Sequence, residues 1–156
     1  MRPTLPAALA LLAAISACGG STTEPGADPL EITYAPGLGI DLAAMTRTSS
    51  GLFYQDVTVG AGAEVRAGNV VRVTYSGWLP NGTLFDSRTD PGSPLEFLLG
   101  GGLVIRGWDE GVAGMRVGGV RTFVIPPSLG YGSRAVGPIP ANSVLVFRVG
   151  MVGVRS

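Results

Sequence analysis

A set of aromatic and apolar side chains beside loops offers the clearest chemistry in this sequence. Trp108 stands just after a glycine in a short apolar stripe, and Asp86 directly follows Phe85. Tyr131 stands between two glycines of a long loop rich in glycine and proline. Apolar walls with a few oriented polar groups are typical of a concave ligand pocket. The predicted pocket residues are Tyr75, Phe85, Asp86, Leu95, Val104, Ile105, Trp108, Tyr131, Ile139 and Phe147.

Each of these residues, taken alone, also has a purely structural interpretation. Phe147 in a strand and Trp108 on a helix face both fit ordinary core packing. Asp86 fits a cap of the turn after its strand equally well, because a short carboxylate accepts hydrogen bonds from nearby backbone N–H groups. Tyr131 is harder to assign to a core, since its hydroxyl needs a partner and its glycine neighbours give no rigidity.

The composition excludes several kinds of catalytic chemistry. The chain of 156 residues has no histidine, so Ser-His-Asp catalysis, Cys-His catalysis and histidine-ligated zinc are excluded. Its single cysteine, Cys18, can form neither a disulfide within the chain nor a metal-binding cluster. Eleven basic and eleven acidic residues give a net charge of zero, which does not favour a nucleic-acid partner. We therefore expect no metal, no cofactor and no nucleic acid.

The N-terminus has the pattern of a bacterial lipoprotein signal. A short positively charged start, residues 1–3, precedes an apolar run, residues 7–15, that is too short to span a bilayer. Small residues then lead to Cys18, whose thiol can carry a diacylglycerol thioether. An ordinary secretory signal with a chance cysteine is the alternative. We predict a lipoprotein signal peptide over residues 1–17 and a lipidated N-terminus and linker over residues 18–50.

This leader also predicts where the protein works. A lipid on Cys18 would attach it to a membrane on the periplasmic side of the cell envelope, at the outer membrane where the organism has one, because no aspartate follows the cysteine. The linker is rich in Gly, Ser, Thr and Pro, which is typical of a segment that buries little surface. Its stretch 34–45 is expected to be partly ordered, docked on the domain as a short strand.

Hydrophobic periodicity places the pocket residues on several short strands and one helix. Residues 69–79 alternate apolar and polar side chains, which is typical of a strand with one buried face. Apolar residues recur at helical spacing from Val104 to Met115 and predict the one helix of the domain, ended by Gly118 and Gly119. Strands with one short helix predict an α+β fold, in which an antiparallel sheet wraps over the helix. The other predicted strands are residues 51–60, 84–87, 95–100, 120–127 and 143–154.

Four blocks of sequence follow one another between Gly51 and Val154, namely VTYSGWLPNGTLFDSR, VIRGWDEG, VGGVRTFVIPPSLGYG and IPANSVLVF. Together they resemble the FKBP-type peptidyl-prolyl cis-trans isomerases. The resemblance implies an FKBP-like curved antiparallel β-sheet, a half-barrel wrapped around one short α-helix, over residues 51–156. It also implies an enzyme that accelerates rotation about X-Pro bonds in folding proteins of the cell envelope, with the substrate proline over the indole of Trp108.

The resemblance further implies roles for individual residues. The Ile105 backbone N–H and the Tyr131 hydroxyl would hold carbonyl oxygens of the ligand. Asp86 would lie beside the carbonyl of the rotating bond and accept a hydrogen bond from Tyr75. Phe85 completes the expected catalytic set. Proline-containing polypeptides are the expected substrates, and macrolides such as tacrolimus or rapamycin are expected ligands. The expected substrate-binding residues are Tyr75, Leu95, Val104, Trp108, Ile139 and Phe147.

The chain departs from the family pattern at four places. Pro91 stands where many relatives carry an arginine that pairs with the pocket aspartate, and Arg88 is the nearest substitute. Leu95 occupies a wall position that is usually aromatic. A frequent Ile-Pro-Pro block ends in Ala141 here, and the loop after Tyr131 is slightly shorter. These departures bear on affinity and substrate preference.

Two other functions fit the same features. One is a membrane-tethered chaperone that binds proline-containing segments without essential isomerase turnover. The other is a surface lipoprotein that uses the fold as a platform for partners. The nearly complete pocket favours the isomerase. We expect a monomer, because the sequence before the domain has no long amphipathic stretch that would form a helical dimerisation arm.

Overall fold

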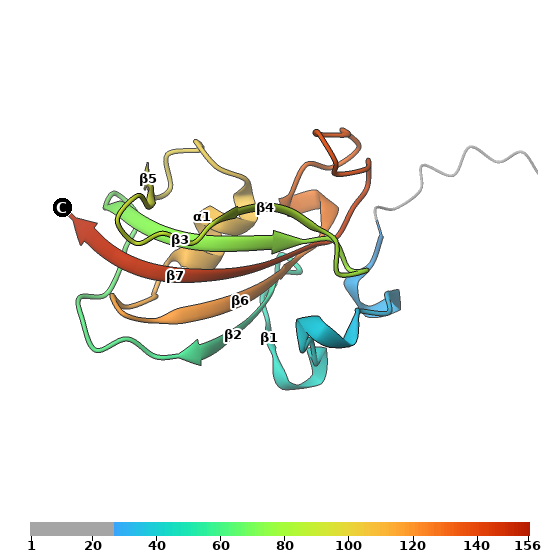
Figure 1. The fold of residues 1–156 in the computed structure, drawn as a ribbon, viewed down its shortest axis with the longest axis horizontal. Coiled ribbons are helices and arrows are strands. Elements are labelled where there is room, and N and C mark those ends of the chain that lie inside the picture. Colours follow the sequence, from blue (N-terminus) through green and yellow to red (C-terminus); the bar gives the residue numbers. More distant parts are fainter. Residues whose placement is uncertain (1–26) are drawn as a thin grey trace, which may run out of the picture.

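The structure is a computed structural model that describes residues 27–156 of the chain (Figure 1). The strands of this range are β1 (Thr46–Arg47), β2 (Phe53–Thr58), β3 (Val70–Trp78), β4 (Leu84–Arg88), β5 (Leu95–Leu98), β6 (Val120–Ile125) and β7 (Leu145–Arg155). The α-helix is α1 (Arg106–Val112). The short 3-10 turns are η1 (Pro29–Glu31), η2 (Pro36–Leu38), η3 (Leu42–Ala44) and η4 (Pro127–Leu129).

One antiparallel sheet contains all of these strands, in the order β1-β2-β6-β7-β3-β4, with β5 also paired to β3. The long strand β3 pairs with β7 along one edge and shares its other edge between β5 and β4. Helix α1 lies against one face of the sheet, as Figure 1 shows. The structure confirms the predicted α+β fold, in which a curved antiparallel sheet wraps around one short α-helix. The sheet stays open, with β1 and β4 at its edges.

The predicted alternation along the central strands decides where the core lies. Val71 and Val73 of β3, with Val149 and Met151 of β7, are at most 2% exposed and pack in the apolar cluster that includes α1. The intervening Arg72 lies on the opposite face of the sheet, because successive side chains of a strand point to opposite sides. Burial of this one apolar face is the main stabilising contribution to the fold.

Helix α1 is shorter than the sequence predicted. It spans Arg106–Val112, so Val104 precedes it and Met115 follows it, and the predicted end at the next glycine pair is wrong. The chain leaves the helix because its backbone pairs elsewhere: the Gly114 N–H donates to the Val65 oxygen, and the Val65 N–H donates to the Met115 oxygen, both at 2.8 Å. Val65 is distant in sequence, so periodicity along the helix carries no sign of this pairing.

Two glycines let α1 approach β6 closely. A Cβ atom at Gly107 would lie 2.7 Å from Ile125 Cγ2, and one at Gly111 would lie 2.8 Å from Phe123 Cε1. Such distances are shorter than a carbon–carbon contact allows. Side chains at either position would therefore push α1, and with it Trp108, away from the sheet.

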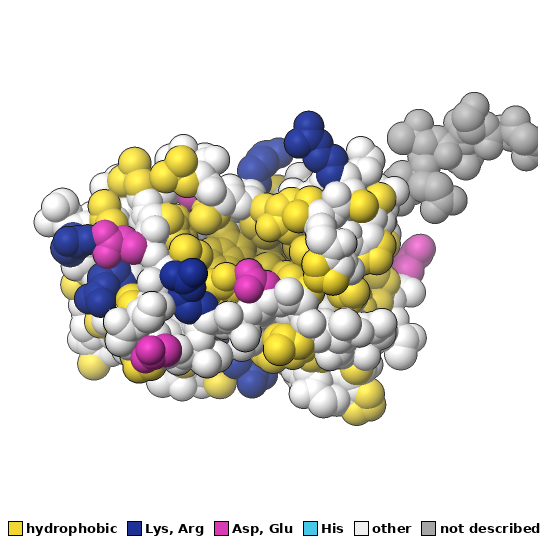
Figure 2. All heavy atoms as spheres, turned by 45° about the horizontal axis from the view of Figure 1, so that its top comes forward, with side chains coloured by type: hydrophobic (Ala, Val, Ile, Leu, Met, Phe, Trp, Pro, Cys, Tyr) yellow, Lys and Arg dark blue, Asp and Glu magenta, His cyan; other side chains and the backbone are white. Residues whose placement is uncertain are grey.

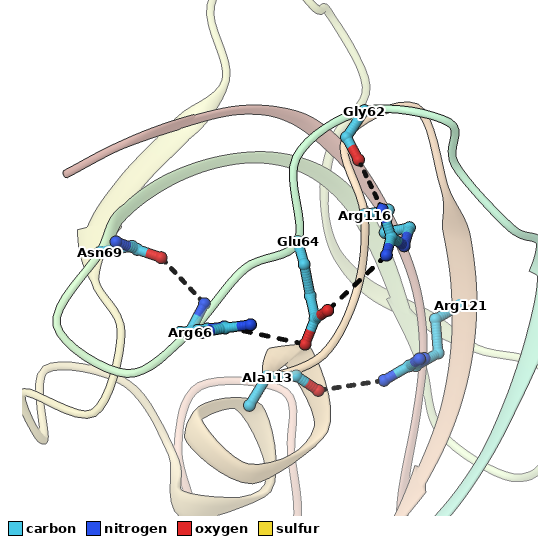
Figure 3. Close-up of polar contacts among 7 residues, drawn as sticks. All are labelled: Gly62, Glu64, Arg66, Asn69, Ala113, Arg116 and Arg121. Atoms are coloured by element: carbon cyan, nitrogen blue, oxygen red, sulfur yellow. Dashed lines mark hydrogen bonds and ion pairs between the residues drawn. The ribbon is translucent and has the colours of Figure 1, made fainter.

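A buried arginine fastens the C-terminal end of α1 to the sheet. Arg121 of β6 is 8% exposed and donates to both carboxylate oxygens of Asp56, at 2.7 and 3.0 Å. Its Nη1 donates to the carbonyl oxygens of Gly111 and Ala113 at 2.9 and 3.3 Å, and the second of these contacts is drawn in Figure 3. The guanidinium also lies 4.8 Å from the ring centre of Tyr54. Arg121 thus satisfies carbonyl groups that the end of a helix leaves unpaired.

Residues 27–50, expected to be a linker, pack on the sheet as an N-terminal arm. The turns η2 and η3 form where we expected a docked strand, η1 precedes them, and the arm joins the sheet through the two residues of β1. Leu38 and Met45 of the arm pack with Phe53 and Val146 in a second apolar cluster. Val146 alternates along β7 with Leu145 and Phe147 of the first cluster, so the arm covers the face of the sheet opposite α1 (Figure 1).

The local sequence explains the turns of the arm. Asp28 and Asp41 each cap a turn by accepting a hydrogen bond from the N–H two residues later, at 3.0 and 3.1 Å. Pro36 begins η2, where its fixed φ suits the first position of a turn. The Ala35 N–H donates to the Pro80 oxygen at 2.8 Å, which fastens the arm to the turn between β3 and β4.

The predicted signal peptide and Cys18 lie outside the described residues. Within residues 27–156, no helix has the length and apolar character needed to cross a bilayer. Lipid attachment at Cys18 therefore stays a prediction.

We expect Leu38→Ala to lower the free energy of unfolding by about 2–3 kcal/mol, because removal of a buried leucine side chain leaves a cavity. Leu30→Ala on the same arm is the matched control. Leu30 is 55% exposed, so its removal should change stability by less than about 0.5 kcal/mol. Chemical denaturation measures both variants, and equal small losses would show that the arm does not pack on the sheet.

Candidate functional site

Trp108 forms the floor of a cavity of about 320 Å³. The indole is 3% exposed, because the rings of Tyr75, Phe97 and Phe147 surround it. Tyr75 and Phe147 meet it nearly edge-on, with ring centres 5.1 and 5.2 Å away and interplanar angles of 84° and 88°. Its Nε1 is buried without a hydrogen-bond partner among the described residues. No hydrogen bond from Nε1 among the described residues holds the indole, so packing fixes its position in the floor.

All ten sequence-predicted pocket residues line this one cavity. Figure 2 shows a hollow of hydrophobic surface near the middle of the face that it draws. The lining comes from β3, β4, β5, α1 and β7, and from the loops that precede α1 and β7. Their part in substrate binding stays a prediction. The ten residues are Tyr75, Phe85, Asp86, Leu95, Val104, Ile105, Trp108, Tyr131, Ile139 and Phe147.

Four further residues line the cavity that the sequence analysis did not include: Leu103, Val136, Gly137 and Pro138. Leu103 is 72% exposed and Val136 is 38% exposed. Both are apolar residues in loops that also carry predicted pocket residues, and this pattern could have identified them. Gly137 and Pro138 form a tight turn closed by hydrogen bonds between Val136 and Ile139, both 2.9 Å long. Nothing in the sequence indicated that this turn faces the cavity.

Gly77 of β3 makes room for two of the aromatic walls. A Cβ atom at Gly77 would lie 2.6 Å from Phe147 Cε1 and 2.7 Å from Phe85 Cζ. These two rings meet edge-on, with centres 5.4 Å apart at 87°. Any side chain at position 77 would therefore displace one of them. Strand alternation placed Gly77 on the inner face but did not explain why glycine is required there.

Asp86 is the acidic residue of the cavity lining, and it accepts a hydrogen bond from the Tyr75 hydroxyl at 2.7 Å. The alternative role as a turn cap is not seen. The loop after β4 is capped instead by Asp90, whose Oδ1 accepts from the Gly92 N–H at 2.8 Å. The Asp86 carboxylate therefore belongs to the cavity.

The tyrosine hydroxyls of the site remain protonated donors. Burial, and then the hydrogen bond and charge of Asp86, raise the pKa of Tyr75 to about 12. Burial and the charge of Asp86 also raise the pKa of Tyr131. The Tyr131 hydroxyl has no hydrogen-bond partner within residues 27–156, and the side chain is 37% exposed. It is thus available to donate to a ligand.

The departures from the family pattern leave Asp86 without an ion pair. Arg88 does not replace the missing arginine, because its Nη1 donates to the Pro94 oxygen at 3.5 Å and no salt bridge within residues 27–156 includes Asp86. Pro91 lies in the exposed loop after β4. Leu95 lines the cavity as an aliphatic wall.

The backbone of Ile105 is placed by the start of α1. Its carbonyl oxygen accepts the Trp108 N–H at 2.9 Å, which begins the first turn of the helix. Its own N–H has no acceptor among the described residues, and the residue lines the cavity. The helix thus orients this peptide while leaving its donor available to a ligand.

The cavity can bind a ligand through an apolar floor and walls and through three oriented polar groups. These groups are the Asp86 carboxylate, the Tyr131 hydroxyl and the Ile105 N–H. No cluster of three or more His, Cys, Asp or Glu side chains in the part of the chain that the structure describes is placed to hold a metal ion. Fold and cavity together define an open half-barrel with an apolar cavity on its inner face.

Comparison with known proteins identifies the family. The model of the FKBP-type peptidyl-prolyl cis-trans isomerases matches residues 62–152. An FK506-binding protein of Neisseria meningitidis serogroup B is 47% identical over 105 residues, 67% of this chain and 96% of that protein. The crystal structure of AtFKBP13 has a TM-score of 0.66 at 40% identity, covering 71% of this chain and 98% of that one. The chain belongs to the FKBP-type peptidyl-prolyl cis-trans isomerase family.

Some relatives are much longer proteins. FK506-binding protein 4 of Mycosarcoma maydis is 47% identical over 110 residues, 70% of this chain, but the match spans only 29% of that protein.

We expect Asp86→Asn to lower the pKa of Tyr75 from about 12, because the negative charge that favours the neutral phenol is lost while burial remains. Since the pKa of Tyr75 is raised from 10.0, its contribution to stability is complete below pH 10 and is lost as the pH rises toward 12. NMR titration of labelled tyrosine measures the shift. Asp90→Asn, which also removes one charge, should leave the pKa unchanged, and equal shifts in both variants would contradict the assignment.

Proposed function

We propose that this protein accelerates cis-trans rotation about X-Pro bonds in folding proteins of the cell envelope. The apolar cavity over Trp108, in a chain of the FKBP family, is the observation that best supports this proposal. A proline ring is compact and apolar and suits a flat indole floor with ring walls. Because relatives bear the name FK506-binding protein, we also expect tacrolimus or rapamycin to occupy the same cavity.

Rotation about an X-Pro bond requires no nucleophile, base or metal, and an apolar surrounding is enough to favour it. Rotation about an X-Pro bond is slow because amide resonance imposes a barrier of about 18–20 kcal/mol. Resonance places partial negative charge on the carbonyl oxygen and partial positive charge on nitrogen, and twisting removes this charge separation. A dry apolar cavity therefore favours the twisted bond over the planar one.

The polar groups at the margin would orient the peptide and bias the rotating bond. The Ile105 N–H and the Tyr131 hydroxyl would donate to carbonyl oxygens that flank the bond. Asp86 would lie beside the carbonyl of the bond itself. A carboxylate repels the partial negative charge of the planar form, so it favours the twisted form without any proton transfer.

The leader sequence supports a tethered location. The residues before Cys18 follow the pattern of a lipoprotein signal, and the acyl chains of a lipidated cysteine would give stable attachment. Attachment on the periplasmic side would place the cavity where secreted polypeptides fold.

We expect Phe85→Ala to lower kcat/KM for a Leu-Pro peptide about tenfold, because one wall of the cavity is lost. Tyr131→Phe should have a smaller effect, since it removes a single hydrogen bond. Trp108→Ala should also weaken substrate binding more than Tyr131→Phe, although it additionally removes a buried side chain. NMR exchange spectroscopy on the peptide measures the rates.

Leu84→Ala is the matched control for this series. Leu84 precedes Phe85 on β4 but is 53% exposed and does not line the cavity, so its rate should stay within about twofold of wild type. Equal and negligible effects in all variants would show that the cavity is not the substrate site. Absence of any acceleration by the wild-type protein would instead favour a binding role without turnover.

We expect Cys18→Ser to release the protein from the membrane fraction into the soluble fraction, because serine cannot carry the thioether-linked lipid. Fractionation of cells that express each form measures this. A wild-type protein that is already fully soluble would contradict the lipid anchor while leaving the isomerase proposal intact.

A further inference from the structure

The loop between β5 and α1 (residues 99–105) lines one side of the cavity, yet it begins with glycines that give it little stiffness. Three glycines stand in a row at positions 100–102. Gly100 and Gly102 have φ values of +80° and +70°, which other residues rarely adopt. Glycine also has the most backbone freedom to lose on ordering. Contacts from outside the loop must therefore hold its conformation.

The carboxylate of Asp109 supplies two such contacts. The Gly100 N–H donates to Oδ1 at 2.8 Å, and the Gly102 N–H donates to Oδ2 at 3.2 Å. Hydrogen bonds to a charged acceptor are stronger than those between neutral groups. Asp109 directly follows Trp108 in α1, so one turn of the helix carries both the cavity floor and the group that clamps the loop.

The clamp lies next to the part of the loop that faces the cavity. Leu103, Val104 and Ile105 follow Gly102 directly, and all three line the cavity. The Ile105 N–H is the donor that would hold a substrate carbonyl. Asp109 itself does not line the cavity, so an effect that it has on the reaction is indirect, and its bonds to the loop lead to these three residues.

We propose that Asp109 is a positioning residue for the isomerase reaction, whose carboxylate holds the β5–α1 loop so that Val104 and the Ile105 N–H meet the substrate at a fixed place above the indole. This rests on the proposed function. Without the clamp, substrate binding has to order a glycine-rich loop, which weakens binding. Removal of the carboxylate therefore raises KM and changes kcat little.

The test compares Asp109→Ala, which removes both acceptors, with Asp109→Asn, which keeps one acceptor oxygen. Glu110→Ala is the control. Glu110 lies in the same turn, and its carboxylate accepts from Ser50 Oγ at 2.6 and 2.7 Å instead of from the amides of the loop. KM and kcat for a Leu-Pro peptide, amide hydrogen exchange and unfolding in denaturant are measured for each variant.

We expect Asp109→Ala to raise KM about tenfold and Asp109→Asn to raise it less. The amides of Gly100 and Gly102, which lose their acceptors, should exchange faster in both, while amides of β7 keep their protection. Glu110→Ala should leave KM and loop exchange as in wild type. If Asp109→Ala does not fold, Asp109→Asn carries the same test.

Two results would overturn the proposal. One is an unchanged KM and unchanged loop exchange in a folded Asp109 variant. The other is the same rise in KM in Glu110→Ala as in an Asp109 variant of equal unfolding free energy, which would show a general effect of stability. If the wild-type protein shows no turnover, the proposed function fails, and the exchange of the loop amides still reports whether Asp109 holds the loop.

Discussion

The close approach of α1 to β6 is the contact on which the cavity depends. Because Gly107 and Gly111 have no side chains, the helix lies directly on Ile125 and Phe123. The indole on that helix is thereby held among the rings of the sheet, where it forms a floor that packing fixes in place. Arg121 secures the end of the same helix through its carbonyl groups. The two glycines, the aromatic rings of the sheet and Arg121 thus shape the site, although none of them is a reactive group.

The N-terminal arm bears on how the proposed lipid at Cys18 would place the domain. Because residues 27–50 pack on the sheet, the packed domain reaches back at least to Ala27, within the range expected to be a linker. If Cys18 carries the proposed lipid, the stretch from Cys18 to Ala27 spans at most about 30 Å, whereas a free linker up to residue 50 would allow about 110 Å. The docked arm would therefore keep the cavity near the membrane surface, and its own contacts reach the turn that leads into β4.

Some cavity residues could be predicted from local patterns, since Tyr75 and Phe147 occupy inward positions of alternating strands and Tyr131 stands between two glycines of a loop, while the family resemblance supplied the full set. The strands and the curved sheet followed from the same alternation and from the family resemblance. What the sequence did not reveal depends on partners that only folding brings together. Helix α1 ends early because Gly114 pairs with Val65. Gly77 is required because the rings of Phe85 and Phe147 fill the space that a side chain there would need. Asp109 accepts hydrogen bonds from the loop that precedes its helix. The arm likewise packs on an apolar patch of the sheet, and the sequence of the arm does not indicate that this patch exists.

We propose that the apolar cavity over Trp108 accelerates rotation about the X-Pro bond without any proton transfer or covalent step. The most direct test measures cis-trans exchange of a Leu-Pro peptide by NMR, with and without the protein, in H₂O and in D₂O. We predict a clear acceleration of equal size in both solvents. No acceleration, or an acceleration that falls markedly in D₂O because a proton moves in the slow step, would contradict the claim.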